Sequence, residues 1–361
     1  MTYKETLFFV AKCLTISLDD KNRIAVQKQL QSDMIEWDAV VKVSTSHYVF
    51  PALYCNLKRV DFLKYLPKDL LDYMEHITHL NRDRNLQIIE QAKEINKLLL
   101  ANDITPVFLK GTGNLLEGLY DDIAERMVGD IDFIVSIVDY SKTIQLLKSY
   151  NYTKYSDGFS DFRHYPRLIK ENKIAAVEVH KELLLKKYTH EFNFNIVHKE
   201  IQKINGINLL SFEHQFAISI IAKQINDNGL HYKDIALRNG YDVFILSKKI
   251  NGKEAISKFN TLKYPLNWFL ASCYIAFGNI DSLEYELSEE TEKYLYTFND
   301  LLIDDRKRNS KKKIDNKLFI KDRMSIIYKS IFKKEYRVWL FKRISDRNWQ
   351  KEKLAQLGLK K

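Results

Sequence analysis

At 361 residues the chain is longer than one ordinary hydrophobic core requires, so we expect two or three packed units. An apolar content of 45% suits a globular interior, and three widely separated cysteines predict neither a disulfide framework nor a zinc site, which favours a reduced, cytoplasmic setting. The net charge of +10 resides in the last 61 residues, because residues 1–300 carry about −3, and no stretch reaches the roughly 18 apolar residues of a membrane span.

Residues 1–103 are predicted to be a helical region. The N-terminus has a short apolar run but neither a basic leader nor a small-residue cleavage site. Apolar residues at three- and four-residue spacing predict helices at Glu5–Leu14, Lys21–Ser32, Met34–Ser44, Lys68–His79 and Asn85–Ala101. His76 and His79 lie three residues apart, but no cysteine or carboxylate stands at ligand spacing, so we interpret them as ordinary imidazoles.

Residues 104–210 hold the strand signals. Val107–Leu109 is predicted to be a buried strand, followed by a small-residue turn at residues 111–113, a short amphipathic helix and a second strand that starts at Asp130. Successive side chains of a strand point to opposite faces, so Asp130 and Asp132 share one face and Ile131 shares the other with apolar residues. Two adjacent buried carboxylates repel each other, which predicts a divalent cation between them.

A third carboxylate follows on a predicted hairpin. After a helix at Val138–Tyr150, the arms Phe162–Lys170 and Ile174–His180 flank a polar turn. Glu178 and His180 share a face of the second arm, on a strand that can lie beside the aspartates. Helices are expected to resume from Lys181.

Residues 211–302 are predicted to be a helical domain with Ser211 as its first cap. Its expected helices are Phe212–Asn226, His231–Lys249, Tyr264–Phe277 and Glu289–Leu302. Residues 303–361 form a basic, partly helical tail, in which 20 Lys and Arg stand against 7 Asp and Glu from Leu301 onward. Interleaved aromatics and cations at Tyr328–Arg343 suit RNA or another polyanion, but they also suit a solvated helix that packs Ile331, Trp339 and Leu340 onto the body.

The order of these motifs resembles the nucleotidyltransferases of the DNA polymerase beta superfamily. The resemblance rests on Leu109-Lys110-Gly111, a helix with a Tyr120-Asp121 exit, the RxxGDxD run Arg126–Asp132, and Glu178 with His180 two residues later. More narrowly, residues 20 to 300 resemble a bacterial group of uncharacterised nucleotidyltransferases. Two departures from the superfamily pattern are Glu178 where the third acid is usually Asp, and Gly111-Thr112 where Gly-Ser is often seen.

The resemblance implies an α+β fold with a small mixed sheet backed by helices, and it implies an enzyme. The reaction would move a nucleoside monophosphate from an NTP such as ATP to a hydroxyl and release pyrophosphate. Asp130, Asp132 and Glu178 would hold two Mg²⁺ ions, with Mn²⁺ as a substitute, and stabilise the attacking and leaving oxygens. The amino end of the helix at Gly111, Thr112 and Gly113 would receive the β- and γ-phosphates.

Several neighbouring side chains have two interpretations each. Lys110 contacts phosphate or covers apolar surface at a strand end. Arg126 orients Asp130 or a neighbouring carboxylate, or it binds phosphate. His180 is interpreted as a supporting or packing residue. Six further charged residues have two interpretations: they line the substrate cleft, or they form salt bridges with one another. They are Arg163, Arg167, Lys170, Lys223, Arg238 and Asp242.

Hypotheses of other classes remain beside the enzyme. One is a nucleotidyltransferase-fold protein without turnover that binds nucleic acid through its tail, and another is a helical interaction protein in which the Asp-x-Asp strand is incidental. The intact carboxylate set argues against the first, and the motif order argues against the second. The base, the acceptor (RNA such as tRNA, a protein or a small molecule) and the oligomeric state are not predicted.

Overall fold

The computed structural model describes residues 1–32, 34–155, 163–309 and 311–347. It divides into two compact units, Met1–Ile303 and Asp304–Lys361. The buried apolar side chains of the first unit form one cluster that extends from Leu7 to Leu302. The finer boundaries at residues 103 and 210 remain predictions, and predicted strand residue Phe162 lies outside the described residues.

The first unit begins with five helices: α1 (Tyr3–Cys13), α2 (Asp20–Leu30), α3 (Trp37–Ser46), α4 (Phe50–Arg59) and α5 (Lys68–Leu100). Helix α4, with Pro51 in its first turn, was not predicted. The two helices predicted at 68–79 and 85–101 are one helix of 33 residues. Asn81 and Asn85 interrupt the apolar period, but both are buried and hydrogen bonded, so the helix continues through them.

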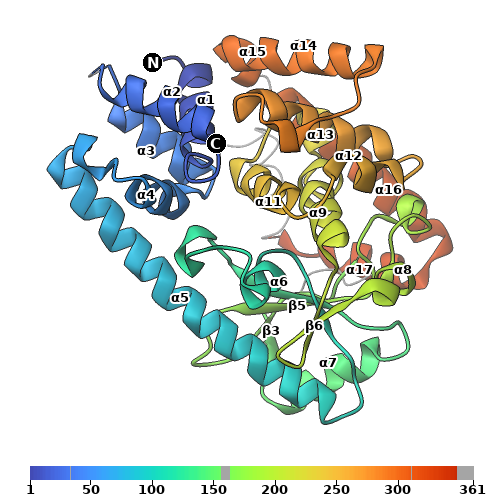
Figure 1. Ribbon diagram of the computed structural model, residues 1–361. Coiled ribbons are helices and arrows are strands. Elements are labelled where there is room, and N and C mark those ends of the chain that lie inside the picture. Colours follow the sequence, from blue (N-terminus) through green and yellow to red (C-terminus); the bar gives the residue numbers. More distant parts are fainter. Residues whose placement is uncertain (33, 156–162, 310, 348–361) are drawn as a thin grey trace. The chain divides into compact units, whose positions relative to one another are not determined.

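Helix α5 joins the N-terminal helices to the sheet. Figure 1 shows this helix running along the sheet. At 1.5 Å per residue it is roughly 50 Å long. Its polar side chains bind main-chain groups of the following region: Asn81 Nδ2 donates to the Ala124 carbonyl at 2.7 Å and Asn85 Nδ2 to the Ile123 carbonyl at 2.6 Å. Gln91 donates to the Ala175 carbonyl at 2.9 Å and accepts from the Ala175 amide at 3.1 Å.

Within the described part of the chain, seven strands form one mixed sheet in the order β3-β4-β5-β2-β1-β7-β6. They are β1 (Val107–Phe108), β2 (Asp130–Ile134), β3 (Thr153–Lys154), β4 (Leu168–Ile169), β5 (Ala176–His180), β6 (Gln202–Ile204) and β7 (Ile207–Leu209). The pairs β2–β5 and β1–β7 are parallel, and the other neighbours are antiparallel. With helices α6 (Lys110–Glu117) and α7 (Tyr140–Ser149), this arrangement confirms the predicted α+β fold.

The region after β5 differs from the prediction that helices resume at Lys181. A short helix, α8 (Phe194–Val197), is followed by the β6–β7 hairpin. The turn of this hairpin is Asn205-Gly206, and the two residues have positive φ angles of 51° and 78°. Asn-Gly is a strong hairpin signal because this turn type needs positive φ at both central positions. The predicted hairpin of β4 and β5 does form, although β4 is only two residues long.

Six helices and a π-helical segment complete the first unit: α9 (Phe212–Ile221), the π segment η5 (Ala222–Asn226), α10 (Gly229–Tyr232), α11 (Leu237–Ser247), α12 (Gly252–Ser257), α13 (Lys263–Ala276) and α14 (Glu289–Ile303). Ser211 caps α9 as predicted, accepting from the His214 amide. The helix predicted from His231 begins only at Leu237, because Lys233 takes a left-handed conformation and ends α10. Within the described residues no helix combines the length and the apolar character needed to cross a bilayer.

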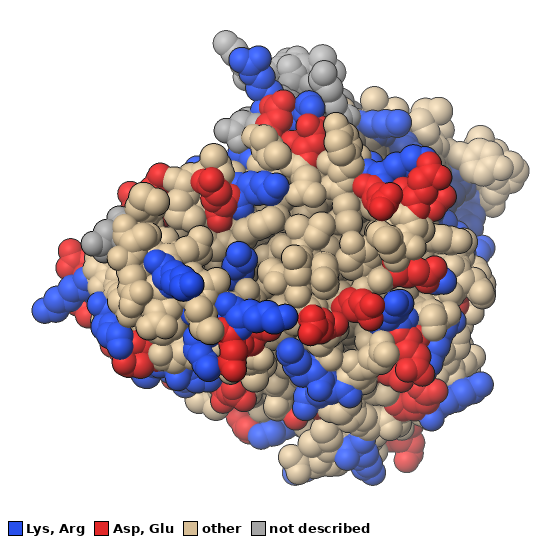
Figure 2. Space-filling model, turned by 45° about the horizontal axis from the view of Figure 1, so that its top comes forward, with Lys and Arg blue, Asp and Glu red and all other residues tan. Residues whose placement is uncertain are grey.

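The second unit contains α15 (Asp305–Asn309), α16 (Lys311–Phe332) and α17 (Lys334–Ile344). Ile331 is 60% exposed, and Trp339 and Leu340 are half-buried, so the choice between packing and polyanion binding stays a prediction. On the face drawn in Figure 2, Lys and Arg side chains are mixed with Asp and Glu.

Candidate active site

The parallel pairing of β2 and β5 brings the predicted carboxylates together. Asp132 lies beside Glu178 in the register, and Ile134 lies beside His180. Since side chains alternate along a strand, Asp130, Asp132, Glu178 and His180 share one face. The opposite face is fully buried through residues such as Phe133 and Val179, both 0% exposed. The core on one side therefore fixes where the acidic side chains point on the other.

Two cationic side chains neutralise these carboxylates. Lys110 Nζ lies 2.7 Å from Asp132 Oδ1 and 3.9 Å from Glu178 Oε2. Arg167 bridges two acids, with Nη2 at 2.9 Å from Asp130 Oδ2 and Nε at 2.9 Å from Glu178 Oε1. Lys110 therefore contacts the acidic cluster, by which we mean Asp130, Asp132 and Glu178. This contact excludes the interpretation that Lys110 only covers apolar surface.

The surroundings push the pKa values of two acids in opposite directions. Burial opposes ionisation of Glu178, but the hydrogen bonds with His180 and Arg167 and the charges of Lys110 and His164 outweigh it and lower the pKa of Glu178. Burial raises the pKa of Asp130, against the attraction of Arg167 and together with repulsion from Glu178. The lowered pKa favours the carboxylate form of Glu178, which is the form that binds metal.

His180 contacts the acidic cluster. Its Nε2 lies 2.8 Å from Asp132 Oδ1 and 3.5 Å from Glu178 Oε2, whereas its buried Nδ1 has no hydrogen-bond partner. Ligand atoms of Asp132, Glu178 and His180 all lie within 4.8 Å of one another, which could hold a metal ion. The carboxylate oxygens of Asp132 and Glu178 are ligands of the kind that Mg²⁺ and Mn²⁺ prefer. Sequence reasoning gave His180 only a supporting role, although its position two residues after Glu178 was the available signal.

The small residues 111–113 form the first turn of α6 rather than a separate turn. Lys110 has φ 52°, and the N-cap residue Leu109 offers no side-chain cap. A Cβ on Gly113 would lie 3.0 Å from the Phe108 carbonyl oxygen, so glycine lets the helix approach β1 closely. Thr112 Oγ1 donates to the Asp130 carbonyl at 2.7 Å and ties α6 to β2.

Arg126 is held by a buried acid on α11. Its Nε and Nη2 lie 2.9 Å from Asp242 Oδ1 and Oδ2, and Tyr120 donates to the same carboxylate at 2.6 Å. Arg126 thus orients a carboxylate, as one of its two interpretations held, but that carboxylate is Asp242 and not Asp130.

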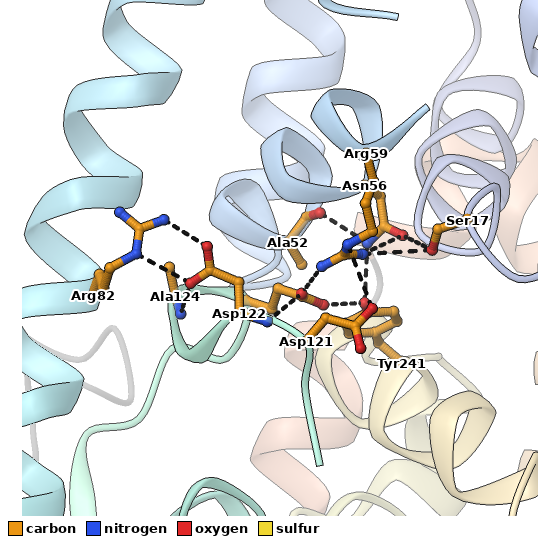
Figure 3. Close-up of polar contacts among 10 residues, drawn as sticks. Ser17, Ala52, Asn56, Arg59, Arg82, Asp121, Asp122, Ala124 and Tyr241 are labelled. Atoms are coloured by element: carbon orange, nitrogen blue, oxygen red, sulfur yellow. Dashed lines mark hydrogen bonds and ion pairs between the residues drawn. The ribbon is translucent and has the colours of Figure 1, made fainter. Parts of the chain in front are cut away.

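The neighbouring Glu125 is held by a second network, of which Figure 3 labels Asn56, Arg59 and Tyr241. Its carboxylate pairs with Arg59 of α4 and accepts from Tyr241 of α11, and Asn56 donates to the Tyr241 hydroxyl at 3.0 Å. Consecutive residues 125 and 126 are therefore bound by consecutive residues 241 and 242. These contacts anchor the segment that leads into β2.

A pocket of about 340 Å³ opens over the acidic face. The pocket is lined by six of the predicted site residues: Lys110, Gly111, Arg126, Asp130, Asp132 and Glu178. Thr112 and Gly113, in the same turn of α6, are buried and do not line it. Of the expected cleft residues, Arg163, Arg167, Arg238 and Asp242 line it. Lys223 instead pairs with Asp234 at 2.7 Å, and Lys170 lies over Tyr152. Sequence reasoning missed His164, Asn226, Asp227 and Asn239 in the lining.

Comparison with known families agrees with this geometry. The sequence profile described as uncharacterised nucleotidyltransferase matches residues 33–276. The chain belongs to this family. The matched range contains the acidic face, α6 and α11 but not the second unit, which is consistent with a nucleotidyltransferase of mixed α+β fold. Among curated proteins and among solved structures, none matches the chain significantly.

Proposed function

We propose that this member of the nucleotidyltransferase family is an enzyme that transfers a nucleoside monophosphate from an NTP to a hydroxyl acceptor and releases pyrophosphate. The observation that carries the proposal is the convergence of Asp130, Asp132 and Glu178 on one face of the β2–β5 pair, inside a pocket that the amino end of α6 also lines. Acidic oxygens on a rigid strand pair and amide donors at a helix start are the parts that phosphoryl chemistry uses.

Each part has a role in this proposal. Asp130, Asp132 and Glu178 hold divalent metal, Mg²⁺ with Mn²⁺ as a substitute, and we expect two ions. Bound metal supplies electrostatic stabilisation of the attacking and leaving oxygens. Lys110, which already neutralises Asp132, and the amide of Gly111 face the phosphates. The lowered pKa of Glu178 suits a ligand better than a proton acceptor.

The test is transfer of label from NTPs. Full-length protein is incubated with α-labelled ATP, GTP, CTP and UTP, Mg²⁺, and either total RNA or cell extract, and label on macromolecules or small acceptors is followed. The double variant Asp130→Ala with Asp132→Ala should lower transfer at least about hundredfold, because metal stabilisation amounts to several kcal/mol. Glu90→Gln, an exposed carboxylate on α5, is the matched control and should leave transfer unchanged.

The outcomes separate the hypotheses. Loss of transfer with EDTA and recovery with Mg²⁺ or Mn²⁺ supports the enzyme. Transfer that survives the double variant contradicts the assigned site. Metal-dependent NTP binding without transfer to any acceptor, together with RNA binding, favours a protein without turnover that uses its basic second unit.

A further inference from the structure

The charged side chains of the pocket are not all paired. Five cations and five anions line it: Lys110, Arg126, Arg163, Arg167 and Arg238 with Asp130, Asp132, Glu178, Asp227 and Asp242. Lys110 and Arg167 bind the acidic cluster, and Arg126 binds Asp242. Among the described residues, Arg163 and Arg238 have no carboxylate within 4.0 Å. Two arginines that line the pocket thus form no direct ion pair with a carboxylate of the described residues.

Arg238 is placed at a position unfavourable for its own charge. The neighbouring charge of Arg126, and then burial, lower the pKa of Arg238 to about 10. Its guanidinium carbon lies 5.0 Å from the centre of the Tyr48 ring, which supports the side chain from outside the pocket. Its buried Nε has no hydrogen-bond partner. A buried donor without an acceptor costs free energy that a bound anion would recover.

Arg163, which also lines the pocket, has a similar environment. Burial lowers its pKa, partly offset by Asp227 and Glu178. Its main-chain carbonyl accepts from the amides of Lys181 and Glu182, at 2.8 and 3.0 Å, so the backbone that carries it is fixed to the end of β5. Arg163 therefore stands beside the end of β5 that carries Glu178 and His180, and among the described residues its side chain forms no ion pair within 4.0 Å.

The position of Arg238 relates it to α6. The guanidinium carbon of Arg126 lies 3.5 Å from where a Cβ on Gly111 would be, and Arg126 is the charge that most affects Arg238. Gly111, Arg126 and Arg238 all line the same pocket. The charge of Arg126 is already paired with Asp242, so a phosphate at the first turn of α6 has Arg238 as a further cation in the same pocket.

We propose that Arg238 and Arg163 form a polyphosphate subsite in this pocket, with Arg238 on the terminal phosphates and Arg163 on those next to the acidic cluster. This inference rests on the proposed function in that the natural ligand is the triphosphate of an NTP. Planar guanidinium groups bind phosphate oxygens in pairs, which fixes the chain more firmly than an ammonium group would. The subsite selects triphosphates over nucleoside monophosphates.

The test measures binding to full-length protein by calorimetry at physiological salt. The probes are inorganic tripolyphosphate and the Mg²⁺ complexes of AMP, ADP and the α,β-methylene analogues of the four NTPs. Loss of a charged hydrogen-bond donor should weaken binding roughly tenfold to hundredfold. Arg238→Gln is expected to weaken tripolyphosphate and triphosphates by this factor and AMP by less than about twofold, and Arg163→Gln to weaken all phosphorylated probes.

Two further variants keep the test decisive. Arg238→Lys, which retains charge but not the planar fork, should recover part of the lost affinity if the substitution acts through phosphate. Arg23→Gln removes an exposed arginine of α2 and should change nothing. Triphosphate binding that is equal in the wild type and in Arg238→Gln overturns the inference and leaves the proposed function intact. Tripolyphosphate binding that depends on Arg238 without any nucleotide binding supports the subsite and overturns the proposed function.

Discussion

At the scale of single residues, Asp242 connects two buried side chains. It pairs with Arg126, and it accepts from the Tyr120 hydroxyl, whose pKa burial and this carboxylate raise. Asp242 is 1% exposed and Arg126 is 6% exposed. Breaking a buried pair by removing one charge is more costly than never forming it, because the remaining charge is left without a partner.

Asp242→Asn should therefore lower the free energy of unfolding by about 3–5 kcal/mol. The measurement is urea denaturation at pH 7. Glu94→Gln is the matched control, because it breaks the pair of Glu94 with Lys173 at a carboxylate that is 59% exposed. Its expected cost is under about 1 kcal/mol. Equal costs for the two variants would contradict the assignment of Arg126 and Asp242 as a buried, mutually dependent pair.

Part of the candidate site follows from the sequence at this scale. Alternation along a strand is enough to put Asp130 and Asp132 on the same face of one strand, and Glu178 and His180 on the same face of another strand. Alternation does not say that Arg167 bridges two strands, or that Arg126 finds its partner 116 residues later. Such partners depend on tertiary contacts that no local pattern encodes.

At the scale of elements, the start of α13 depends on a distant carboxylate. The N-cap residue Leu262 offers no side-chain cap of its own. Glu191 instead accepts from the amides of Asn260, Thr261 and Leu262, at 2.7, 3.0 and 3.3 Å. Burial opposes ionisation of Glu191, but these hydrogen bonds and one from the Thr261 hydroxyl outweigh it and lower its pKa.

The pH dependence of stability follows from this shift. A carboxyl whose folded-state pKa lies below its unfolded value stabilises the fold above the unfolded value, about 4.5 here, and this contribution is lost as pH falls through the folded value. Glu191→Gln should cost about 1–3 kcal/mol at pH 7, and the difference from wild type should shrink below about pH 4.5. Urea denaturation at pH 7, 5.5, 4 and 3 measures it.

A difference that stays constant down to pH 3 would show that the charge of Glu191 is not what stabilises the start of α13. The exposed Glu290 of α14 provides the control, since Glu290→Gln should change stability by less than about 0.5 kcal/mol at every pH.

Elements with a clear apolar period were predictable, and those defined by polar contacts were not. Helices α9, α13 and α14 lie close to their predicted ranges because a stripe of apolar residues faces the core. The continuity of α5 depends on buried asparagines that bind main-chain carbonyls, which a hydrophobic period cannot reveal. The β6–β7 hairpin was not predicted from the sequence, although Asn205-Gly206 is a hairpin turn signal.

At the scale of the whole molecule, the two compact units are expected to have separable functions. A chain ending at Ile303 keeps the pocket and the whole matched family range. It should fold cooperatively and bind Mg²⁺–NTP within about twofold of the full chain. Its affinity for RNA at low salt should fall, and the dependence of log affinity on log salt should become shallower, because fewer cations displace counterions from phosphates.

Filter binding of RNA between 50 and 300 mM salt and calorimetry with nucleotide measure the two properties side by side. Unchanged RNA affinity at low salt in the shortened chain would remove the polyanion role of the basic helices. Loss of nucleotide binding in a shortened chain that still unfolds cooperatively would mean that the second unit takes part in the nucleotide site.

The long helix α5 has a consequence for how this family member can be dissected. Its Asn81, Asn85 and Gln91 donate to main-chain carbonyls that precede β2 and β5, at residues 123, 124, 126 and 175. A fragment begun at residue 104 would leave those carbonyls and the Ala175 amide without partners and strip the sheet of its flanking helix. The sheet that carries the acidic residues therefore cannot be separated from α5, and any minimal version of this protein has to begin upstream of Lys68.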